Sequence, residues 1–372
     1  MKIGLVTIYQ VPNYGSVLQT YATQEVLKKL GHECVVINYK YPNEWHYQHG
    51  FTKRKKSVRG FLGILLGLTP YYRRLKHLDS FRKKYLNLTK EYASHQEVVK
   101  ENFDEYDLFV VGSDQVWNTK FLKGDPFFLL FFLRKDVRRI SIASSFAQKV
   151  LDKSFEDLFK AELAKFDALS VRERNGVGII KNQLRINKDV EQVLDPTLLL
   201  SKDDWLRVIP RSKFKPRKKY ILWYVLSYAF QPKPYIIQVA QYYKKMLGDC
   251  DIIGLEGYCK DMDDESVQMI NKEDASISEF IDLFANAELV ITSSFHGTAF
   301  AVNFGKPLIS VVPDNNGDDR QTSLLRDLNL VDCVASIGRN FKELNPFYDI
   351  CEEQCVLGSI RAFSLSWIKK NI

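Results

Sequence analysis

The sequence predicts an α/β protein built from two Rossmann-like, doubly wound domains that face a cleft. Short β-branched apolar runs alternate with helical patterns, which is typical of parallel sheets with helical crossovers. The alternation starts afresh after a Pro- and Lys-rich stretch at 210–219, which is interpreted as a linker. The chain has 372 residues, more than one ordinary domain needs.

The first domain is expected to cover residues 1–209. It opens with an apolar strand at 2–9, an amphipathic helix at 16–31 and a second strand at 33–39. This βαβ order predicts a parallel sheet. A basic insertion lies near 40–100, and further strands are expected at 108–111, 140–143, 168–171 and 192–194.

The second domain is expected to cover residues 210–354, and residues 355–372 are predicted to form a terminal helix that packs back on the first domain. The apolar runs predict strands at 220–225, 251–255, 289–291 and 307–312. Helical patterns fill the gaps, at 234–247, 277–287 and 297–304.

Composition indicates a cytoplasmic protein. Hydrophobic residues make up 45% and charged residues 26%, as in ordinary globular chains. The N-terminus enters a strand directly, without the pattern of a secretory signal. The apolar run at 61–68 is too short to span a bilayer. Six scattered cysteines without a CxxC pair fit a reducing compartment and suggest no metal site.

The excess positive charge is local. Residues 51–84 hold 11 Lys and Arg against one Asp, which leaves 42 basic and 44 acidic residues elsewhere. That distribution argues against a nucleic-acid-binding face and for a local anionic partner. Two interpretations stay open for 51–84: an inserted helical hairpin with solvated lysines, or peripheral attachment to an anionic membrane surface through basic clusters such as 53–56.

Four loops place polar residues after apolar strands, where open α/β sheets bind ligands. The first is 12–19, in which Gly15 permits close backbone approach and the following helix offers free N–H groups. Its candidate ligand contacts are Asn13, Tyr14 and Gly15. The alternative is a loop that Asn13 or Ser16 merely caps.

The second loop, 110–118, combines amide, hydroxyl and carboxylate groups with an indole ring, a set suited to holding a sugar. The candidate residues are Ser113, Asp114, Gln115, Trp117 and Asn118. In the alternative interpretation Asp114 caps a helix and Trp117 belongs to the core.

The third loop follows the strand at 168–171. Arg172 comes directly after that strand, so its guanidinium is expected to project into the cleft and bind a carboxylate or phosphate. The alternative is an ion pair with Glu173 or another neighbour, and Arg174 is expected to be solvated. Asp195 also ends a strand, where its carboxylate can simply cap the following turn.

The fourth loop, "TSSFHG", contains His296 at the start of a helix that Gly305 and Pro307 close. A lone histidine in an apolar run is often a core residue. Here the adjacent hydroxyls and the helix N-terminus favour a functional role. The further candidates for substrate contact are Ser293, Ser294, Gly297 and, in the next loop, Arg320.

These motifs together resemble the polysaccharide pyruvyl transferase family. The resemblance rests on ordered matches over nearly the whole chain: "NYGSVLQTYATQEVLKKLGHE", "YDLFVVGSDQVWN", "SIASSFA", "LSVRE", "VLDPTLLL" and "SSFHGTAFAVNFGKPLISV". It implies a glycosyltransferase-B-like arrangement and a phosphoenolpyruvate donor. The implied product is a pyruvate ketal bridging two hydroxyls of a sugar, in a surface polysaccharide or its lipid-linked precursor.

The resemblance also implies roles for individual residues. His296 is expected to be the general acid–base, Arg172 the anion clamp and Asp114 a base for the acceptor hydroxyl, without a metal or cofactor. The donor is expected in the second domain and the acceptor in the first. Better-understood relatives carry an arginine at the position of Ser294. Two alternatives therefore stay open, a nucleotide-sugar glycosyltransferase and a non-catalytic glycan-binding or assembly protein.

Overall fold

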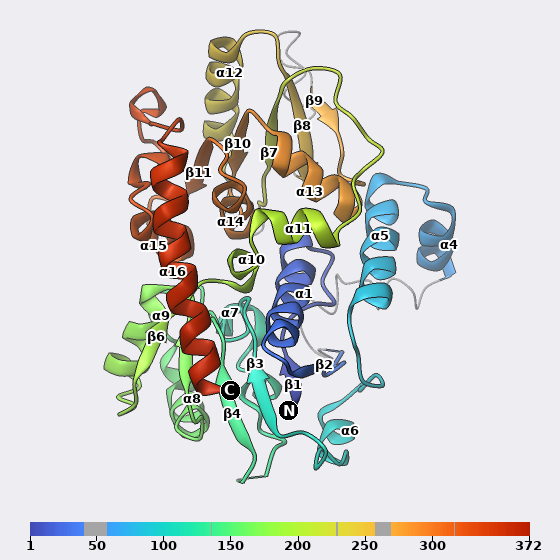
Figure 1. The fold of residues 1–372 in the computed structure, drawn as a ribbon, viewed down its shortest axis with the longest axis vertical. Helices are drawn as coiled ribbons and strands as arrows, with labels where there is room; N and C mark the ends of the chain where they lie inside the picture. Colours follow the sequence, from blue (N-terminus) through green and yellow to red (C-terminus); the bar gives the residue numbers. More distant parts are fainter. Residues whose placement is uncertain (41–57, 135, 228–229, 257–268, 316) are drawn as a thin grey trace.

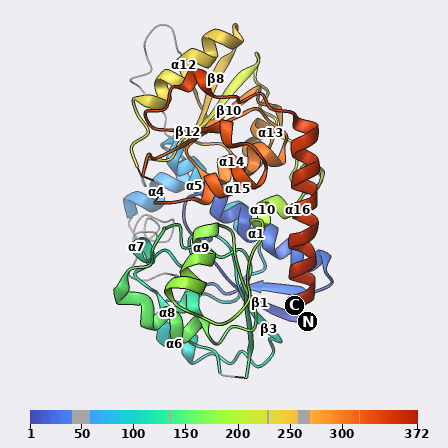
Figure 2. The same cartoon turned by 90° about the vertical axis from the view of Figure 1, so that its left-hand side faces the viewer.

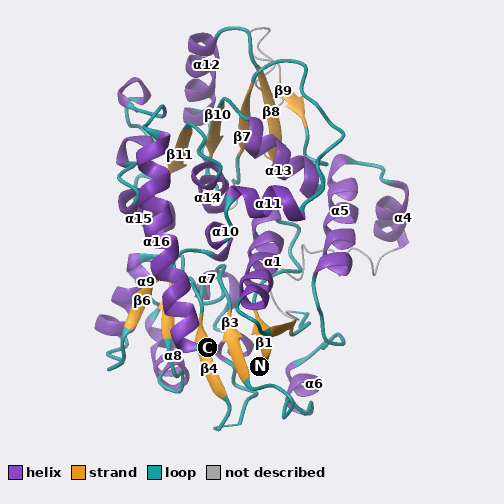
Figure 3. Ribbon diagram, viewed as in Figure 1, coloured by secondary structure: helices purple, strands orange, loops and turns teal. Residues whose placement is uncertain are grey.

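The computed structural model describes residues 1–40, 58–134, 136–227, 230–256, 269–315 and 317–372 (Figure 1). The basic cluster at 53–56 lies outside these ranges. The chain forms two parallel sheets with helices packed around them (Figure 3). The residues before the stretch 210–219 form the first sheet, and the residues after it form the second.

The first sheet has the strand order β2-β1-β3-β4, and all its pairs are parallel. A parallel pair, β5-β6, continues it through isolated bridges from Ile140 to Ala168 and from Ser144 to Val171. The strands are β1 (Lys2–Val6), β2 (Glu33–Val36), β3 (Leu108–Val111), β4 (Arg138–Ser141), β5 (Leu169–Val171) and β6 (Val190–Gln192).

The second sheet has the order β12-β11-β10-β7-β8-β9 and is also parallel throughout. Its central strands are fully buried apolar runs, as expected for a sheet covered on both faces. The strands are β7 (Tyr220–Tyr224), β8 (Asp251–Glu256), β9 (Met269–Asn271), β10 (Leu289–Thr292), β11 (Leu308–Val312) and β12 (Val334–Ser336).

Most helices connect consecutive strands, and several begin at a side-chain cap. Asn13 caps α1, and Ser201 and Ser276 form capping boxes at α11 and α13. In the first half the helices are α1 (Tyr14–Lys29), α4 (Val58–Leu66), α5 (Pro70–Tyr85), α6 (His95–Val99), α7 (Thr119–Leu122), α8 (Glu156–Leu163) and α9 (Arg174–Gly178). The later helices are α10 (Pro196–Leu199), α11 (Lys202–Val208), α12 (Tyr235–Leu247), α13 (Ile277–Asn286), α14 (Phe295–Asn303) and α15 (Arg320–Asp327). Single turns lie at Pro126–Leu129, Lys153–Phe155, Ile179–Gln183, Val331–Cys333 and Phe341–Glu343.

The terminal helix α16 (Ile350–Asn371) runs beside both halves (Figure 2). Gln354 donates to the backbone oxygen of Val302 in the second half, at 2.8 Å. Further along the helix, the backbone oxygen of Asn371 accepts a hydrogen bond from Arg138 on β4, at 3.0 Å. The helix starts earlier than the expected residue 355, because Asp349 caps it.

No helix in the described ranges combines the length and apolar character needed to cross a membrane.

The carboxyl ends of the two sheets face one another. Helix α1, which follows β1, and helix α14, which follows β10, approach so closely that a Cβ atom on Gly15 would lie 2.1 Å from Nδ1 of His296. The two sheets therefore place their strand-end loops at a common interface.

Candidate active site between the two halves

Asp195 lies at the centre of a buried polar cluster between the halves. Its Oδ2 accepts hydrogen bonds from Nη1 of Arg172, at 2.9 Å, and from Oγ of Ser113, at 2.6 Å. The same oxygen lies 3.6 Å from Nε2 of His296, within ion-pair range. Arg172 is 3% exposed and His296 6%, so water reaches this group of charges very little.

The other carboxylate oxygen of Asp195 has the capping role that the sequence suggested for this residue. Oδ1 accepts hydrogen bonds from the backbone N–H and the hydroxyl of Thr197, and Asp195 thereby caps α10. The expected capping role is thus present. It occupies only one oxygen, however, and the second joins the cluster. Its position at a strand end, facing the same interface as Arg172, was the one available signal.

Asp114 is held in the cluster by an unusual backbone conformation. Its φ of 72° lies in the left-handed region, which a residue other than glycine adopts only when its surroundings hold it there. Its Oδ2 accepts a hydrogen bond from Oγ of Ser16 at 2.5 Å, and its Oδ1 lies 3.6 Å from Nη2 of Arg172. The carboxylate therefore points toward the arginine instead of capping a helix.

Arg172 connects the carboxylates. Besides Asp195 and Asp114 it approaches Glu173, whose Oε2 lies 3.8 Å from Nε, and its guanidinium packs 4.3 Å from the ring centre of Phe295. Nε and Nη2 make no hydrogen bond with the described residues. The ion-pair interpretation of Arg172 is thus correct, with Asp195 as the main partner, and two donor groups stay available beside it.

His296 sits in the first turn of α14. Ser294 caps this helix by accepting a hydrogen bond from the backbone N–H of Gly297 at 3.3 Å, and Gly15 packs against the imidazole. Nε2 is buried and makes no hydrogen bond with a described residue. A buried nitrogen of this kind, beside a carboxylate, is suited to exchange a proton with a ligand.

Electrostatics keep the two central carboxylates ionised. Burial by itself raises the pKa of Asp114 and Asp195, but the interactions with His296 and Arg172 outweigh it and lower the pKa of both groups below the ordinary value. Glu173 behaves differently. Burial dominates there and raises its pKa to about 7, although Arg172 acts in the opposite direction. The cluster thus contains two firmly anionic groups and one that titrates near neutral pH.

The structure corrects the expected sugar platform. Trp117 is 1% exposed, its indole N–H donates to the backbone oxygen of Phe128, and its ring packs on Phe146 in the core of the first half. Asn118 caps α7 and donates to the side chain of Gln115, at 2.7 Å. The core interpretation of Trp117 is therefore the right one, because the chain turns inward directly after Asp114.

Several other candidates have structural partners. The hydroxyl of Tyr14 donates to the backbone oxygen of Ala275 at 2.6 Å, which joins the halves. Oγ of Ser293 bonds the backbone N–H and oxygen of Leu226. Arg320, expected to be a second anion contact, forms a bidentate ion pair with Asp318. Arg174, expected to be solvated, pairs with Asp327.

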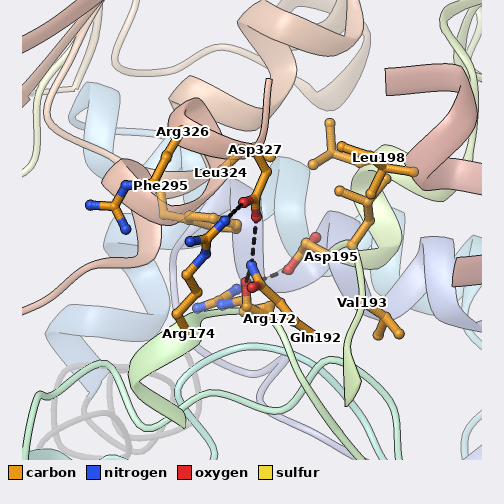
Figure 4. Close-up of a pocket in the computed structure, with 12 residues that line it drawn as sticks. Arg172, Arg174, Gln192, Val193, Asp195, Leu198, Phe295, Leu324, Arg326 and Asp327 are labelled. Carbon is orange, nitrogen blue, oxygen red and sulfur yellow. Dashed lines mark hydrogen bonds and ion pairs between the residues drawn. The ribbon is translucent and has the colours of Figure 1, made fainter. Parts of the chain in front are cut away.

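A cavity of about 400 Å³ opens beside the cluster (Figure 4). Arg172, Asp195 and Phe295 contribute to its wall. Asp327 bridges Arg174 and Gln192 across the two halves, with a distance of 2.9 Å from Nε2 of Gln192. Arg172 and Asp195 thus lie at the wall of the cavity, with their side chains fully buried. Within the described residues, no group of three or more His, Cys, Asp or Glu side chains is arranged to hold a metal ion.

Known structures share this fold at low sequence identity. UDP-GlcNAc 2-epimerase from Neisseria meningitidis, solved with UDP-GlcNAc, aligns with a TM-score of 0.56 and 11% identity over 100% of both chains. The UDP-GlcNAc 2-epimerase from Methanocaldococcus jannaschii gives 0.53 and 12%, covering 97% of this chain and 100% of that one. A glycosyltransferase from Rickettsia africae gives 0.50 and 12%, covering 100% and 93%. These likenesses confirm the predicted glycosyltransferase-B-like fold.

No curated protein matches the chain significantly. The family model described as polysaccharide pyruvyl transferase does match it, over residues 13–315. That range contains every member of the buried cluster, from Ser16 to His296. The match covers most of the sequence, and the chain therefore belongs to the polysaccharide pyruvyl transferase family.

Proposed function

We propose that the protein transfers the pyruvyl group of phosphoenolpyruvate to two hydroxyls of a sugar, forming a ketal and releasing phosphate. The observation that carries this proposal is the buried carboxylate of Asp195, which contacts both Arg172 of the first half and His296 of the second, inside the range matched by the family. It brings a proton-transfer group to an anion-binding group, and the reaction needs both.

The proposed reaction has balanced steps. A proton is added to the methylene carbon of the donor, which becomes a methyl group, while a sugar hydroxyl bonds to the central carbon and loses its proton. The bond from that carbon to the phosphate oxygen then breaks, and the second hydroxyl takes its place. The two hydroxyl protons account for the one gained by the methyl group and the one carried away by phosphate.

The cluster supplies a group for each step. Histidine serves as general acid and base near neutral pH, and Asp195 at 3.6 Å stabilises the cationic imidazole. Asp114, kept ionised, is the proposed base for the acceptor hydroxyl. The free donor groups of Arg172 and the N-terminus of α14 are proposed to hold the carboxylate and phosphate of the donor. With Ser294 capping that helix, Arg172 is the principal cation.

The proposed acceptor is a glycan of a surface polysaccharide, or its lipid-linked precursor. A phosphoenolpyruvate donor needs no cofactor or metal in this scheme, and the proposed place of action is the cytoplasm, at the inner face of the membrane. The acceptor is proposed to bind to the first half and the donor beside His296, from the second.

The test compares ligands and two neighbouring arginines. Phosphoenolpyruvate should raise the melting temperature of the wild-type protein, and UDP-GlcNAc should not. Arg172→Ala should abolish the shift and also lower the free energy of unfolding by about 3–5 kcal/mol, because it leaves buried carboxylates unpaired. Arg174→Ala, which removes a half-exposed ion pair, is the matched control and should change stability by less than about 1 kcal/mol.

Two results would point to the alternatives. Stabilisation by UDP-GlcNAc alone would indicate a nucleotide-sugar glycosyltransferase. Glycan binding without phosphate release, measured with phosphoenolpyruvate and a panel of polysaccharide fragments, would indicate a non-catalytic glycan-binding protein.

A further inference from the structure

We propose that helix α4 and the adjoining face of α5 form a docking surface for an anionic lipid bilayer. The apolar part, here called the α4 ridge, consists of Val58, Leu62, Leu65, Leu66 and Leu68. The basic part, here called the α5 stripe, consists of Lys76 and Lys83. Neither part belongs to the cluster between the halves, so this inference goes beyond the proposed reaction.

The α4 ridge is unusually exposed for its composition. Val58 is 77% exposed, Leu62 45%, Leu65 56%, Leu66 64% and Leu68 65%. Five large apolar side chains within eleven residues thus face outward, although leucine and valine are normally among the most buried residue types. An apolar patch of this kind on an otherwise well-packed protein marks an interaction site.

The geometry of α4 gathers three of these side chains on one side. Val58, Leu62 and Leu65 follow the i, i+4, i+7 spacing of a single helix face. Another side of the helix packs on α5, where Gly63 lies so close to Tyr72 that a Cβ atom would be 2.6 Å from its ring. In Figure 1, α4 stands at the outer edge of the molecule, beyond α5. The ridge therefore points away from the body of the protein.

The α5 stripe supplies positive charge next to the ridge. Lys76 lies one turn after Tyr72, the residue that contacts α4, and Lys83 lies two turns further on the same face. Both lysines are exposed, and Lys83 has one partner, Asp79, at 2.7 Å. Positive charge beside an apolar ridge matches the headgroups and the acyl chains of an anionic membrane.

The structure also shows which basic residues cannot serve this surface. Arg74 is buried and pairs with Glu256 at 3.0 Å, and Arg82 is buried and donates to the backbone oxygen of Val11 at 2.5 Å. Arg73 pairs with Asp274 at 2.9 Å. These three side chains fasten α5 to the two halves, so the docking surface has a rigid base.

A bilayer accounts for both parts of the surface. Nucleic acid would match the lysines but leave the leucines exposed to water. A helix of nine residues is far too short to span a bilayer, so attachment would be peripheral and reversible.

Co-sedimentation with vesicles tests the proposal. The full-length protein should bind vesicles of phosphatidylglycerol and phosphatidylcholine at low salt, bind less at high salt, and bind pure phosphatidylcholine weakly. The ridge variant Leu62→Ser, Leu65→Ser, Leu66→Ser should lower the partition coefficient at least tenfold. The stripe variant Lys76→Gln, Lys83→Gln should lower it by about 25-fold at low salt, because each of the two charges contributes about fivefold.

The matched control replaces three equally exposed apolar residues elsewhere, Val150→Ser, Met246→Ser and Phe363→Ser, and should bind like the wild type. Unchanged melting temperatures show that all variants fold. Absence of wild-type binding to anionic vesicles at low salt, or an equal loss in the control, would overturn the proposal. So would a wild-type dimer that the ridge variant dissociates without any vesicle binding. Vesicle binding needs neither donor nor acceptor, so this outcome is independent of the donor test.

Discussion

The two halves of the molecule contribute very differently to the buried cluster. The first half supplies the fixed charges and their hydroxyl partners: Ser16, Ser113, Asp114, Arg172 and Asp195. The second half supplies the imidazole of His296 and the ring of Phe295. The fixed charges and the imidazole thus come from different halves, and the cluster is complete only when the halves meet.

This division has a physical basis. Four segments of the first half, those that follow β1, β3, β5 and β6, bring these polar and charged side chains to the interface. In the second sheet, the loop after β10 enters α14 directly, so the first helical turn carries the imidazole to that interface.

The largest effect is expected from removing the imidazole. His296→Ala should lower phosphoenolpyruvate-dependent phosphate release by about two to four orders of magnitude, the usual contribution of a general acid–base group. The fixed charges of the first half stay in place, so the melting-temperature shift with phosphoenolpyruvate should persist. His77→Ala, on an exposed part of α5, is the control. Near-normal turnover in a folded His296→Ala variant would remove this residue from the mechanism.

A smaller effect is expected from forcing the halves apart. Gly15→Ala places a Cβ atom 2.1 Å from Nδ1 and 2.7 Å from Cβ of His296, so the start of α14 must shift. We expect a loss of roughly 2–3 kcal/mol in the free energy of unfolding, as for overpacked cores. Urea denaturation measures it.

Gly358→Ala provides the control for Gly15→Ala, because an added Cβ on α16 meets no neighbour within 4 Å. Equal stability of the two alanine variants would show that the halves do not press on each other at Gly15.

The smallest effect concerns Glu173, whose pKa reports on both halves. Burial and the nearby Asp319 of the second half raise its pKa, which reaches about 7. The folded state therefore holds this proton more tightly than the unfolded state does. The contribution of Glu173 to the free energy of unfolding is therefore fully present below the pKa that this group has in the unfolded chain. It is lost as the pH rises through about 7, the pKa of the folded state.

Replacing Glu173 by Gln should remove this pH dependence. Between pH 5.5 and 8, the free energy of unfolding of the wild type should fall by about 2 kcal/mol more than that of Glu173→Gln. Urea denaturation at the two pH values measures the difference, with Glu33→Gln as an exposed control. A variant with the same pH slope as the wild type would contradict the elevated pKa.

Much of the fold could be predicted because buried parallel strands are apolar runs with helical patterns between them. The run at 108–111 matches β3 in full, and 289–291 differs from β10 by one residue. The edge strands β9 and β12 escaped prediction. Each has three residues and is only partly buried, so neither leaves a periodic apolar signal.

The site was predictable in position but less so in detail. The strand-end rule brought Asp114, Arg172 and His296 to one place, as the structure shows. It could not tell that Trp117 turns into the core or that Tyr14 joins the halves, because both depend on contacts distant in the sequence. The sequence suggested only a capping role for Asp195. One oxygen of its carboxylate does cap α10, but the other oxygen binds Arg172 and Ser113 in the cluster.

The burial of His296 has a consequence for the timing of the reaction. With 6% of its surface exposed and Gly15 packed against it, the imidazole cannot touch a sugar while the halves remain in contact. Under the proposed mechanism, each catalytic cycle would include a separation of the halves and their return, and in many enzymes such a step is slower than the chemistry. We therefore expect the turnover number to fall as added sucrose raises solvent viscosity, and a turnover number independent of viscosity would show that domain motion does not limit the rate.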